Sequence, residues 1–318
     1  MPISTPRLLA RASHNPTVES GAQNLLNDQH HESQPLSILN TTPAWTKGDL
    51  RRLGEALAAG RSTADMHERY NAVMLWHNDL AAEVAATLYT TNWQSCPPDR
   101  FDITARPKTI DTLVQKLQRE RKMTLDEVQD LAGVRIDADI TLDVQTALAG
   151  EIAAHFGERS RVRDLRDNPH SGYRAVHVWL RLPAGRVEIQ IRTVGQSAWA
   201  NTYERIGDLL GRGIRYNEMP EDPTARETVV LMHQMSDALA RNERFKVELA
   251  AVRAELKVIQ ESILAKPSEE QSAAPNREVA TRLEEMAQRA RKMENQQDAA
   301  HAEFVSTLNE VRRMLDSA

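Results

Sequence analysis

Residues 172–193, GYRAVHVWLRLPAGRVEIQIRT, decide the fold of this chain. Residues 176–182 and 187–191 alternate apolar and polar side chains, which is typical of strands in which one face is buried. The turn residues Pro183-Ala184-Gly185 lie between these two runs. We therefore predict a pair of strands joined by a tight turn.

The segments around this pair predict one more strand and several helices. The spacing of apolar residues at three and four is typical of helices, and a short apolar run that contains Gly133 is typical of a strand. Because strands alternate with helices, we expect an α/β (α+β) fold with a mixed β-sheet flanked by helices. The predicted elements are two helices within 46–93, separated at Gly60 and Ser62, a helix at 109–121, a strand at 131–136 and a helix at 144–156.

The last hundred residues carry a different pattern. Apolar residues recur at alternating steps of four and three from Leu231 to Ile263, and Asn242 lies within this seam. Such a stripe predicts a coiled coil, in which a polar residue can fix the register. A second stripe runs from Val279 to Leu315, after a break at 266–276. These two helices could form an antiparallel pair, or each could pair with another chain.

Composition divides the chain in the same way. Residues 1–43 are rich in Ser, Thr, Asn, Gln, His and Pro, and we expect a disordered tail there. Residues 44–216 are predicted to form the α/β domain with its N-terminal helices, and residues 217–318 the coiled-coil helices. The whole chain has a net charge of −5, but residues 100–216 have a net charge of +3. The middle domain is therefore suited to an anionic ligand.

Several classes of protein are excluded by composition. No stretch approaches the run of about 20 apolar residues that a membrane span needs, and no signal peptide is recognisable at the start. The single cysteine, Cys96, excludes an internal disulfide framework and a multi-cysteine zinc site. We expect a cytoplasmic protein that does not bind membranes.

Charged residues at the start of the middle domain suit a polyphosphate. Arg106, Lys108 and Lys116 lie where a strand leads into a helix, and Thr112 lies one helical turn before Lys116. Lysines neutralise phosphates as point charges, and the planar arginine group can also stack on a base. Alternatively, these residues form an ordinary solvated helix face, which would be the better interpretation if they stood alone.

Three further groups of polar residues lie on predicted strands or directly before them. Asp130 precedes the strand at 131–136, which contains Arg135. A carboxylate beside a buried strand needs a partner, and on the residues alone the two could form a structural ion pair. Tyr173 and His177 flank the start of the strand at 176–182. In the strand at 187–191 and the two residues after it, one polar face carries Glu188, Gln190 and Arg192.

Four motifs in this order resemble the synthetase domain of the RelA/SpoT alarmone-synthetase family. They are Arg106-Pro-Lys108 with Thr112 and Lys116, Asp130-Leu-Ala-Gly133-Val-Arg135, Gly172-Tyr173-Arg174-Ala-Val-His177 and Glu188-Ile-Gln190-Ile-Arg192-Thr193. The resemblance covers residues 65–216. It implies a nucleotidyltransferase-like fold and a pyrophosphokinase that moves the β,γ-pyrophosphate of ATP to the 3′-hydroxyl of GDP or GTP, which yields (p)ppGpp.

The resemblance also implies a role for each residue. Arg106 and Arg135 would enclose the adenine. Asp130 and Glu188 would bind Mg²⁺, and Glu188 would help to deprotonate the 3′-hydroxyl. The ATP phosphates would be bound by Lys108, Thr112 and Lys116, and the acceptor nucleotide by Tyr173, His177, Gln190 and Arg192. Trp199, in the segment that follows, is expected only to pack.

The sequence departs from the family pattern before Gly172, where Asn168-Pro169-His170-Ser171 lacks the usual Lys and Asn. Upstream of it lies a basic cluster, Arg159, Arg161, Arg163 and Arg166, which could bind the acceptor phosphates or a larger polyanion such as tRNA.

Three alternatives therefore stay open for the function. The acceptor could be GDP or GTP, or it could be an adenosine nucleotide or the 3′ end of tRNA, as in the toxic branch of the family, which is usually accompanied by an antitoxin. The chain could also be a catalytically idle module whose helices bind a partner. We expect a stand-alone small synthetase without the His-Asp pair of the family's hydrolases, and a homo-oligomer formed through the C-terminal helices.

Overall fold

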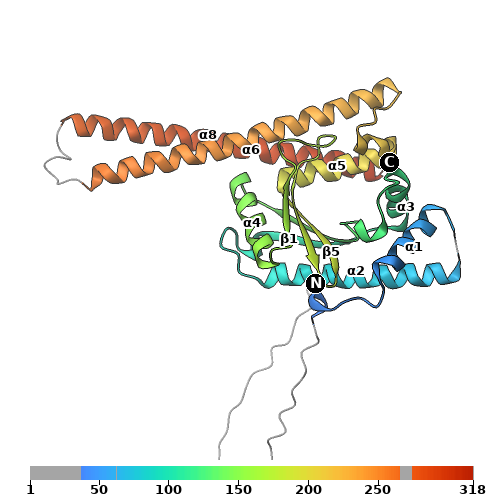
Figure 1. Ribbon diagram of the computed structural model, residues 1–318. Coiled ribbons are helices and arrows are strands. Elements are labelled where there is room, and N and C mark those ends of the chain that lie inside the picture. The colour runs from blue at the N-terminus through green and yellow to red at the C-terminus, as the bar shows by residue number, and fades with distance from the viewer. Residues whose placement is uncertain (1–36, 62, 266–273, 318) are drawn as a thin grey trace, which may run out of the picture. The chain divides into compact units, whose positions relative to one another are not determined.

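A mixed five-stranded β-sheet lies at the centre of the fold (Figure 1). The structure is a computed structural model, and it describes residues 37–61, 63–265 and 274–317. The strand order is β1-β2-β5-β4-β3, in which β2 and β5 are parallel and all other neighbours are antiparallel. The strands are β1 (Phe101–Pro107), β2 (Ala132–Ala138), β3 (Arg161–Asp164), β4 (Val176–Leu182) and β5 (Gly185–Thr193).

Helices flank the sheet, so the predicted fold class is confirmed. The hairpin of β4 and β5 turns tightly after Leu182, as the sequence predicts, and the other predicted elements agree within a few residues. Strands β1 and β3 were not among the predicted elements, although a strand was expected to lead into the helix at 109–121. The α-helices are α1 (Lys47–Ala58), α2 (Ala64–Thr90), α3 (Ile110–Arg119), α4 (Leu142–His155), α5 (Val194–Leu210), α6 (Pro223–Leu264) and α8 (Ala274–Ser317), and the short 3₁₀ turns are η1 (Ile38–Asn40), η2 (Pro98–Arg100), η3 (Leu125–Glu127) and η4 (Arg212–Tyr216).

The apolar face of the sheet packs against α2 and α4. Ile189 and Ile191 of β5 are fully buried there, together with Leu80 and Leu88 of α2 and Leu148 of α4. Burial of an aliphatic side chain of this size contributes about 2 kcal/mol. Since successive side chains of a strand point to opposite faces, burial of the isoleucines places Glu188, Gln190 and Arg192 on the other face.

The strand register aligns the polar residues of that other face in rows. Glu188 is opposite Gly133 on one side and Trp179 on the other, and Gly133 is in turn opposite Arg106. In the next row, Gln190 is opposite Arg135 and His177. The sheet therefore brings residues from four of its strands onto one polar surface.

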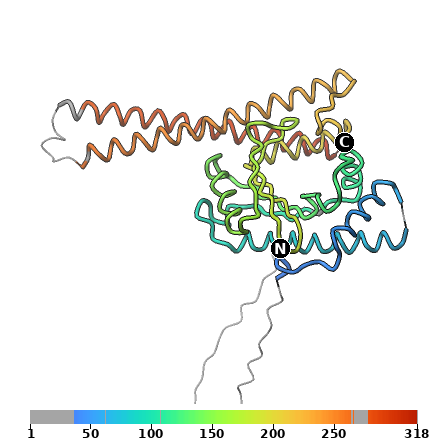
Figure 2. The backbone as a smooth tube through the Cα atoms, viewed as in Figure 1, coloured from blue at the N-terminus to red at the C-terminus, as the bar shows by residue number. Residues whose placement is uncertain are grey.

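The two C-terminal helices pack against each other in antiparallel directions, which answers the question that the sequence left open (Figures 1 and 2). The amide of Asn242 donates to Oε1 of Gln297 at 2.6 Å, so the polar residues of the two predicted seams pair with each other. Lys246 of α6 also forms an ion pair with Asp298 of α8 at 2.8 Å.

Only part of the predicted seam is buried. Leu249 and Leu256 are buried, but Leu231 is 54% exposed and Val252 is 47% exposed. The first half of α6 packs against α5 as well as α8, so a different stripe of its side chains is buried. The buried residues of this half of α6 are Val229, Met232, Ser236, Leu239, Ala240 and Glu243.

Most of the predicted tail, residues 1–36, lies outside the described residues. At its end, the backbone N–H of Ile38 in η1 donates to a carboxylate oxygen of Glu83 in α2 at 2.9 Å.

No helix among the described residues is long and apolar enough to cross a membrane.

Candidate active site

Asp130, just before β2, is the centre of a group of predicted phosphate-binding residues. Lys108 and Lys116 both form ion pairs with it, and the Lys116 Nζ to Asp130 Oδ1 distance is 2.9 Å. Thr112 lies one turn before Lys116 on α3 and donates its hydroxyl hydrogen bond to the carbonyl of Thr109 at 2.9 Å. Three residues of the predicted set, Lys108, Lys116 and Asp130, are thus in contact at the junction of β1, α3 and β2.

The two lysines control the charge of this carboxylate. Burial would raise the pKa of Asp130, but Lys108 and Lys116 lower it to about 2. Asp130 is therefore ionised at neutral pH, and each lysine has a fixed counter-ion. An anionic ligand that approached Asp130 would meet two ammonium groups that are already positioned, so the arrangement favours a polyphosphate.

Arg106 on β1 and Arg135 on β2 share a third residue, Glu204 of α5. Glu204 Oε1 lies 3.3 Å from Nη1 of Arg106 and 3.8 Å from Nη2 of Arg135. Arg135 also donates to Oδ1 of Asn201, one turn earlier on α5, at 3.0 Å. The two arginines that the resemblance assigns to the adenine are therefore held by one carboxylate.

The predicted acceptor residues form a continuous chain of hydrogen bonds. The hydroxyl of Tyr173 shares a hydrogen bond of 3.0 Å with Nε2 of His177 and accepts one of 2.9 Å from Nη2 of Arg192. Arg192 also donates to Oε1 of Gln190 at 3.0 Å, and Gln190 donates to Oε1 of Glu188 at 2.8 Å. The five predicted residues on β4, β5 and the preceding loop are thus connected without a gap.

Glu188 is buried and ionised within this chain. Its Oε2 accepts a hydrogen bond of 2.9 Å from the indole N–H of Trp179 and lies 3.6 Å from Nδ1 of His177. Burial would raise the pKa of Glu188, but the bond and charge of His177 lower it. Conversely, burial would lower the pKa of His177, but Tyr173 and Glu188 raise it to about 9. At neutral pH this is an imidazolium beside a carboxylate.

Two buried guanidinium groups on the polar face keep unpaired donors. Within the part of the chain that the structure describes, Nη1 of Arg192 and both Nε and Nη2 of Arg135 have no hydrogen-bond acceptor. Arg192 is only 1% exposed, so this desolvation is costly, at about 1–3 kcal/mol for each unpaired group. Oxygens of an anionic ligand would satisfy these N–H groups.

Trp179 and Glu204 were not identified from the sequence. Trp179 could have been found, because it lies two residues after His177 on the same strand and so on the same face. Glu204 gives no local signal, because its partners Arg106 and Arg135 lie 98 and 69 residues earlier and meet it only through the packing of α5. Trp199 is buried and donates to the carbonyl of Met232 at 2.7 Å.

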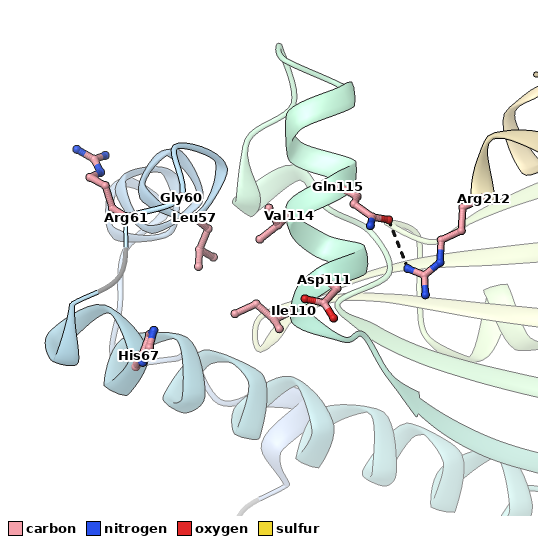
Figure 3. A pocket seen from close by; sticks show the side chains of 9 residues that line it. All are labelled: Leu57, Gly60, Arg61, His67, Ile110, Asp111, Val114, Gln115 and Arg212. Carbon is pink, nitrogen blue, oxygen red and sulfur yellow. Dashed lines mark hydrogen bonds between the residues drawn. The ribbon is translucent and has the colours of Figure 1, made fainter. Parts of the chain in front are cut away.

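A cavity of about 470 Å³ lies away from these residues, between α3 and the α1–α2 corner (Figure 3). Leu57 of α1 faces Ile110 and Val114 of α3 across it, and Arg212 donates to Gln115 at its rim. Ile110 and Val114 lie on another face of α3 than Thr112 and Lys116. The cavity is therefore distinct from the polar face of the sheet.

Comparison with known proteins identifies the family of this domain. Residues 105–206 match the family model described as the region found in RelA / SpoT proteins. The uncharacterized protein Rv1366 of Mycobacterium tuberculosis is 50% identical over 213 residues, which cover 64% of this chain and 77% of that protein. The GTP pyrophosphokinase YwaC of Bacillus subtilis is 26% identical over 152 residues, which cover 42% and 70%.

Among solved structures, small alarmone synthetase 1 from Bacillus subtilis aligns with a TM-score of 0.45 and 21% identity, over 60% of this chain and 98% of that one. Residues 105–206, which match the family model, contain all eleven predicted site residues and define a domain of the pyrophosphokinase class, at the level of the family. The chain belongs to the RelA/SpoT family.

Proposed function

We propose that this protein transfers the β,γ-pyrophosphate of ATP to the 3′-hydroxyl of GDP or GTP. The observation that carries the proposal is the single polar face of the sheet, which brings the lysine-paired Asp130, the Glu188 chain and the unpaired donors of Arg135 and Arg192 together. The family match and the name of the YwaC relative support the same reaction.

On the donor side, the cations would bind ATP. The phosphates would accept hydrogen bonds from the ammonium groups of Lys108 and Lys116 in place of Asp130. The hydroxyl of Thr112 could donate a further hydrogen bond to them. Arg106 and Arg135, which come from adjacent strands and share Glu204, would contact the two faces of the adenine. Binding energy from these contacts would position the β-phosphorus for attack.

The residues present fit Mg²⁺. Asp130 and Glu188 provide two ionised carboxylates, and the charge of Asp130 acts on Glu188. Mg²⁺ is usually bound by one or two carboxylates together with substrate phosphate oxygens. Among the described residues no three His, Cys, Asp or Glu side chains cluster as a metal site, so phosphate oxygens would supply further ligands. When bound, the ion would neutralise charge on the transferred group.

On the acceptor side, Tyr173 would stack on the guanine, and His177 and Arg192 would bind the acceptor's phosphates. Glu188 would accept the proton of the 3′-hydroxyl as the 3′-oxygen of the acceptor attacks the β-phosphorus. The bond between the β-phosphorus and the bridging oxygen to the α-phosphate then breaks, and AMP leaves. Gln190 and Trp179 would orient the carboxylate through their hydrogen bonds.

A transfer assay tests this function. Purified protein is incubated with Mg²⁺, ATP labelled on the γ-phosphate, and GDP, GTP, ATP or deacylated tRNA as the acceptor. Label on GDP or GTP supports the proposal, whereas label only on ATP or tRNA would assign the protein to the alternative acceptors. No transfer to any acceptor would leave the idle interaction module. The following stay predictions: a second copy of the chain, an antitoxin or tRNA as a partner, and a cytoplasmic location.

We expect acceptor binding to weaken in alkaline solution. The pKa of His177 is raised to about 9, so its positive charge is present at neutral pH and is lost as the pH rises through that value. The kcat/KM for the acceptor should therefore fall above about pH 9, while Arg192 keeps its charge. A His177→Gln variant should have a lower kcat/KM at neutral pH and lack this alkaline decline. The same decline in the variant would contradict the assignment.

We also expect Glu204 to affect ATP binding selectively. In Glu204→Gln the shared ion pair with Arg106 and Arg135 is lost, and the KM for ATP should rise about three- to tenfold, as for the loss of about 1 kcal/mol. The KM for the acceptor should change little. Asp208→Asn, which removes a carboxylate one turn further along α5, is the matched control. An equal rise in both KM values would contradict a role specific to ATP.

A further inference from the structure

Helix α6 contacts the loop that carries Tyr173 on both sides of this residue. The hydroxyl of Ser236 donates to the carbonyl oxygen of Gly172 and accepts a hydrogen bond of 3.0 Å from Nε of Arg174. The carboxylate of Asp237 accepts a hydrogen bond of 2.6 Å from Nη2 of Arg174. The residues immediately before and after Tyr173 are therefore both fixed by the same turn of α6.

The backbone of this loop needs such support. Ser171 has a φ of 51° and Gly172 a φ of 81°, so two consecutive residues adopt the left-handed conformation, which is unfavourable for serine. A Cβ atom on Gly172 would lie 2.8 Å from the ring of Trp199 and 3.3 Å from that of His233. The loop is thus enclosed between α5 and α6, and side chains of α6 determine where it can lie.

The contact is buried, and it fixes a charged group. Ser236 is 1% exposed and Arg174 is 7% exposed. A buried guanidinium is tolerated only when its donors are paired, and here the partners are Ser236, Asp237 and the carbonyl of Arg166. Removal of the Ser236 hydroxyl would therefore leave a buried donor of Arg174 unpaired, and removal of the more exposed Asp237 carboxylate would leave its charge unpaired.

The same helix also contacts the segment next to Arg192. Two turns after Ser236, the carboxylate of Glu243 accepts hydrogen bonds from the hydroxyl of Thr193 and, at 3.1 Å, from the amide of Gln196. Thr193 directly follows Arg192 on β5. Arg192 and Tyr173 are hydrogen-bonded to each other at 2.9 Å, so α6 holds the neighbours of both partners.

We propose that α6 is part of the acceptor site, in which Ser236 and Asp237 are positioning residues that fix Tyr173 through Gly172 and Arg174. The proposal rests on the proposed function, in which Tyr173 stacks on the acceptor base. It extends that function to a helix that begins at Pro223, outside the family match at residues 105–206. The C-terminal helices then serve the specificity of the reaction as well as packing on α5.

The test is a comparison of KM values in the full chain. Ser236→Ala should raise the KM for GDP or GTP about tenfold, since it removes the hydrogen bond to the Arg174 guanidinium. Asp237→Asn keeps an acceptor oxygen but removes the charge of the ion pair with Arg174, so a smaller rise of about threefold is expected. The KM for ATP should stay within about twofold, because the partners found for the ATP residues in the described part of the chain are Asp130, Thr109, Asn201 and Glu204, none of which lies on α6. Ser236→Thr, which keeps the hydroxyl, should restore much of the acceptor binding. Glu248→Gln, at an exposed position of α6, is the control.

Backbone amide exchange provides a second readout that does not need activity. Exchange at residues 171–175 should become faster in Ser236→Ala and Asp237→Asn and stay unchanged in α4. An unchanged acceptor KM, or an equal rise in both KM values with a lower melting temperature, would overturn the proposal. If the wild-type protein transfers pyrophosphate to no acceptor, the proposed function fails, whatever the variants show. If amide exchange at 171–175 is unchanged in the two variants, the role of α6 is rejected independently of activity.

Discussion

Replacement of Glu188 by glutamine is expected to lower the rate of pyrophosphate transfer by about 10³-fold or more. The glutamine has nearly the same shape, and its amide oxygen can still accept the hydrogen bond from Trp179 or Gln190. It cannot accept the proton of the 3′-hydroxyl, and it is a poor ligand for Mg²⁺. The measurement is the initial rate of transfer from labelled ATP at saturating acceptor.

Two controls make this result specific. Glu221→Gln changes an exposed carboxylate and should leave the rate unchanged. Circular dichroism and the melting temperature should show that Glu188→Gln is folded, because loss of the charge beside His177 removes only one buried ion pair. A folded variant with a rate within tenfold of the wild type would reject Glu188 as the base.

Replacement of Asp130 by asparagine is expected to lower kcat/KM for ATP by about 10²-fold. The substitution removes one of two carboxylates proposed for Mg²⁺ and leaves Lys108 and Lys116 without their shared counter-ion. Like charges in a partly buried site repel each other, so the lysines should move away from the position in which they would bind phosphates. Steady-state kinetics over a range of ATP and Mg²⁺ concentrations measure the change, and an unaltered dependence on Mg²⁺ would contradict the metal assignment.

The same variant should change how stability depends on pH. The pKa of Asp130 is lowered to about 2, from an ordinary value of 3.8. A lowered carboxylate pKa stabilises the folded state above the unfolded pKa, and this contribution, roughly 2 kcal/mol, is lost as the pH falls towards the folded value. The difference in unfolding free energy between wild type and Asp130→Asn should therefore shrink between about pH 5 and about pH 2.5. A constant difference over that range would reject the pairing.

Much of the site was predictable because its signals are local in the chain. The period-two alternation of residues 187–191 places Glu188, Gln190 and Arg192 on one face whatever the sheet order, because it follows from strand geometry alone. The helical spacing of Thr112 and Lys116 is equally local. These patterns, read with the order of four motifs, predicted eleven site residues. The structure pairs Asp130 with both lysines and links Glu188, Gln190 and Arg192 through hydrogen bonds, while their roles stay predictions.

Other features depend on contacts between distant segments. β3 is a short edge strand with four exposed residues, Arg161–Asp164, and so it has no buried alternating pattern to reveal it. Glu204 meets Arg106 only when α5 packs over the sheet. In α6 the heptad pattern marks one stripe, but α5 selects a neighbouring one, so that Met232 is buried and Leu231 is exposed. Periodicity identifies a helix with an apolar side, but the packing partner decides which stripe is covered.

The sequence by itself determined most of the helices, the strands of the hairpin at 176–193 and most of the polar residues of the candidate site, because these follow from short-range periodicity and motif order. Tertiary structure decided the rest. It set the strand order β1-β2-β5-β4-β3, paired Asp130 with both lysines, placed Glu204 between two arginines and packed α6 against the loop of Tyr173. Each of these contacts joins residues far apart in the chain, and only the packing of whole elements can bring such residues together.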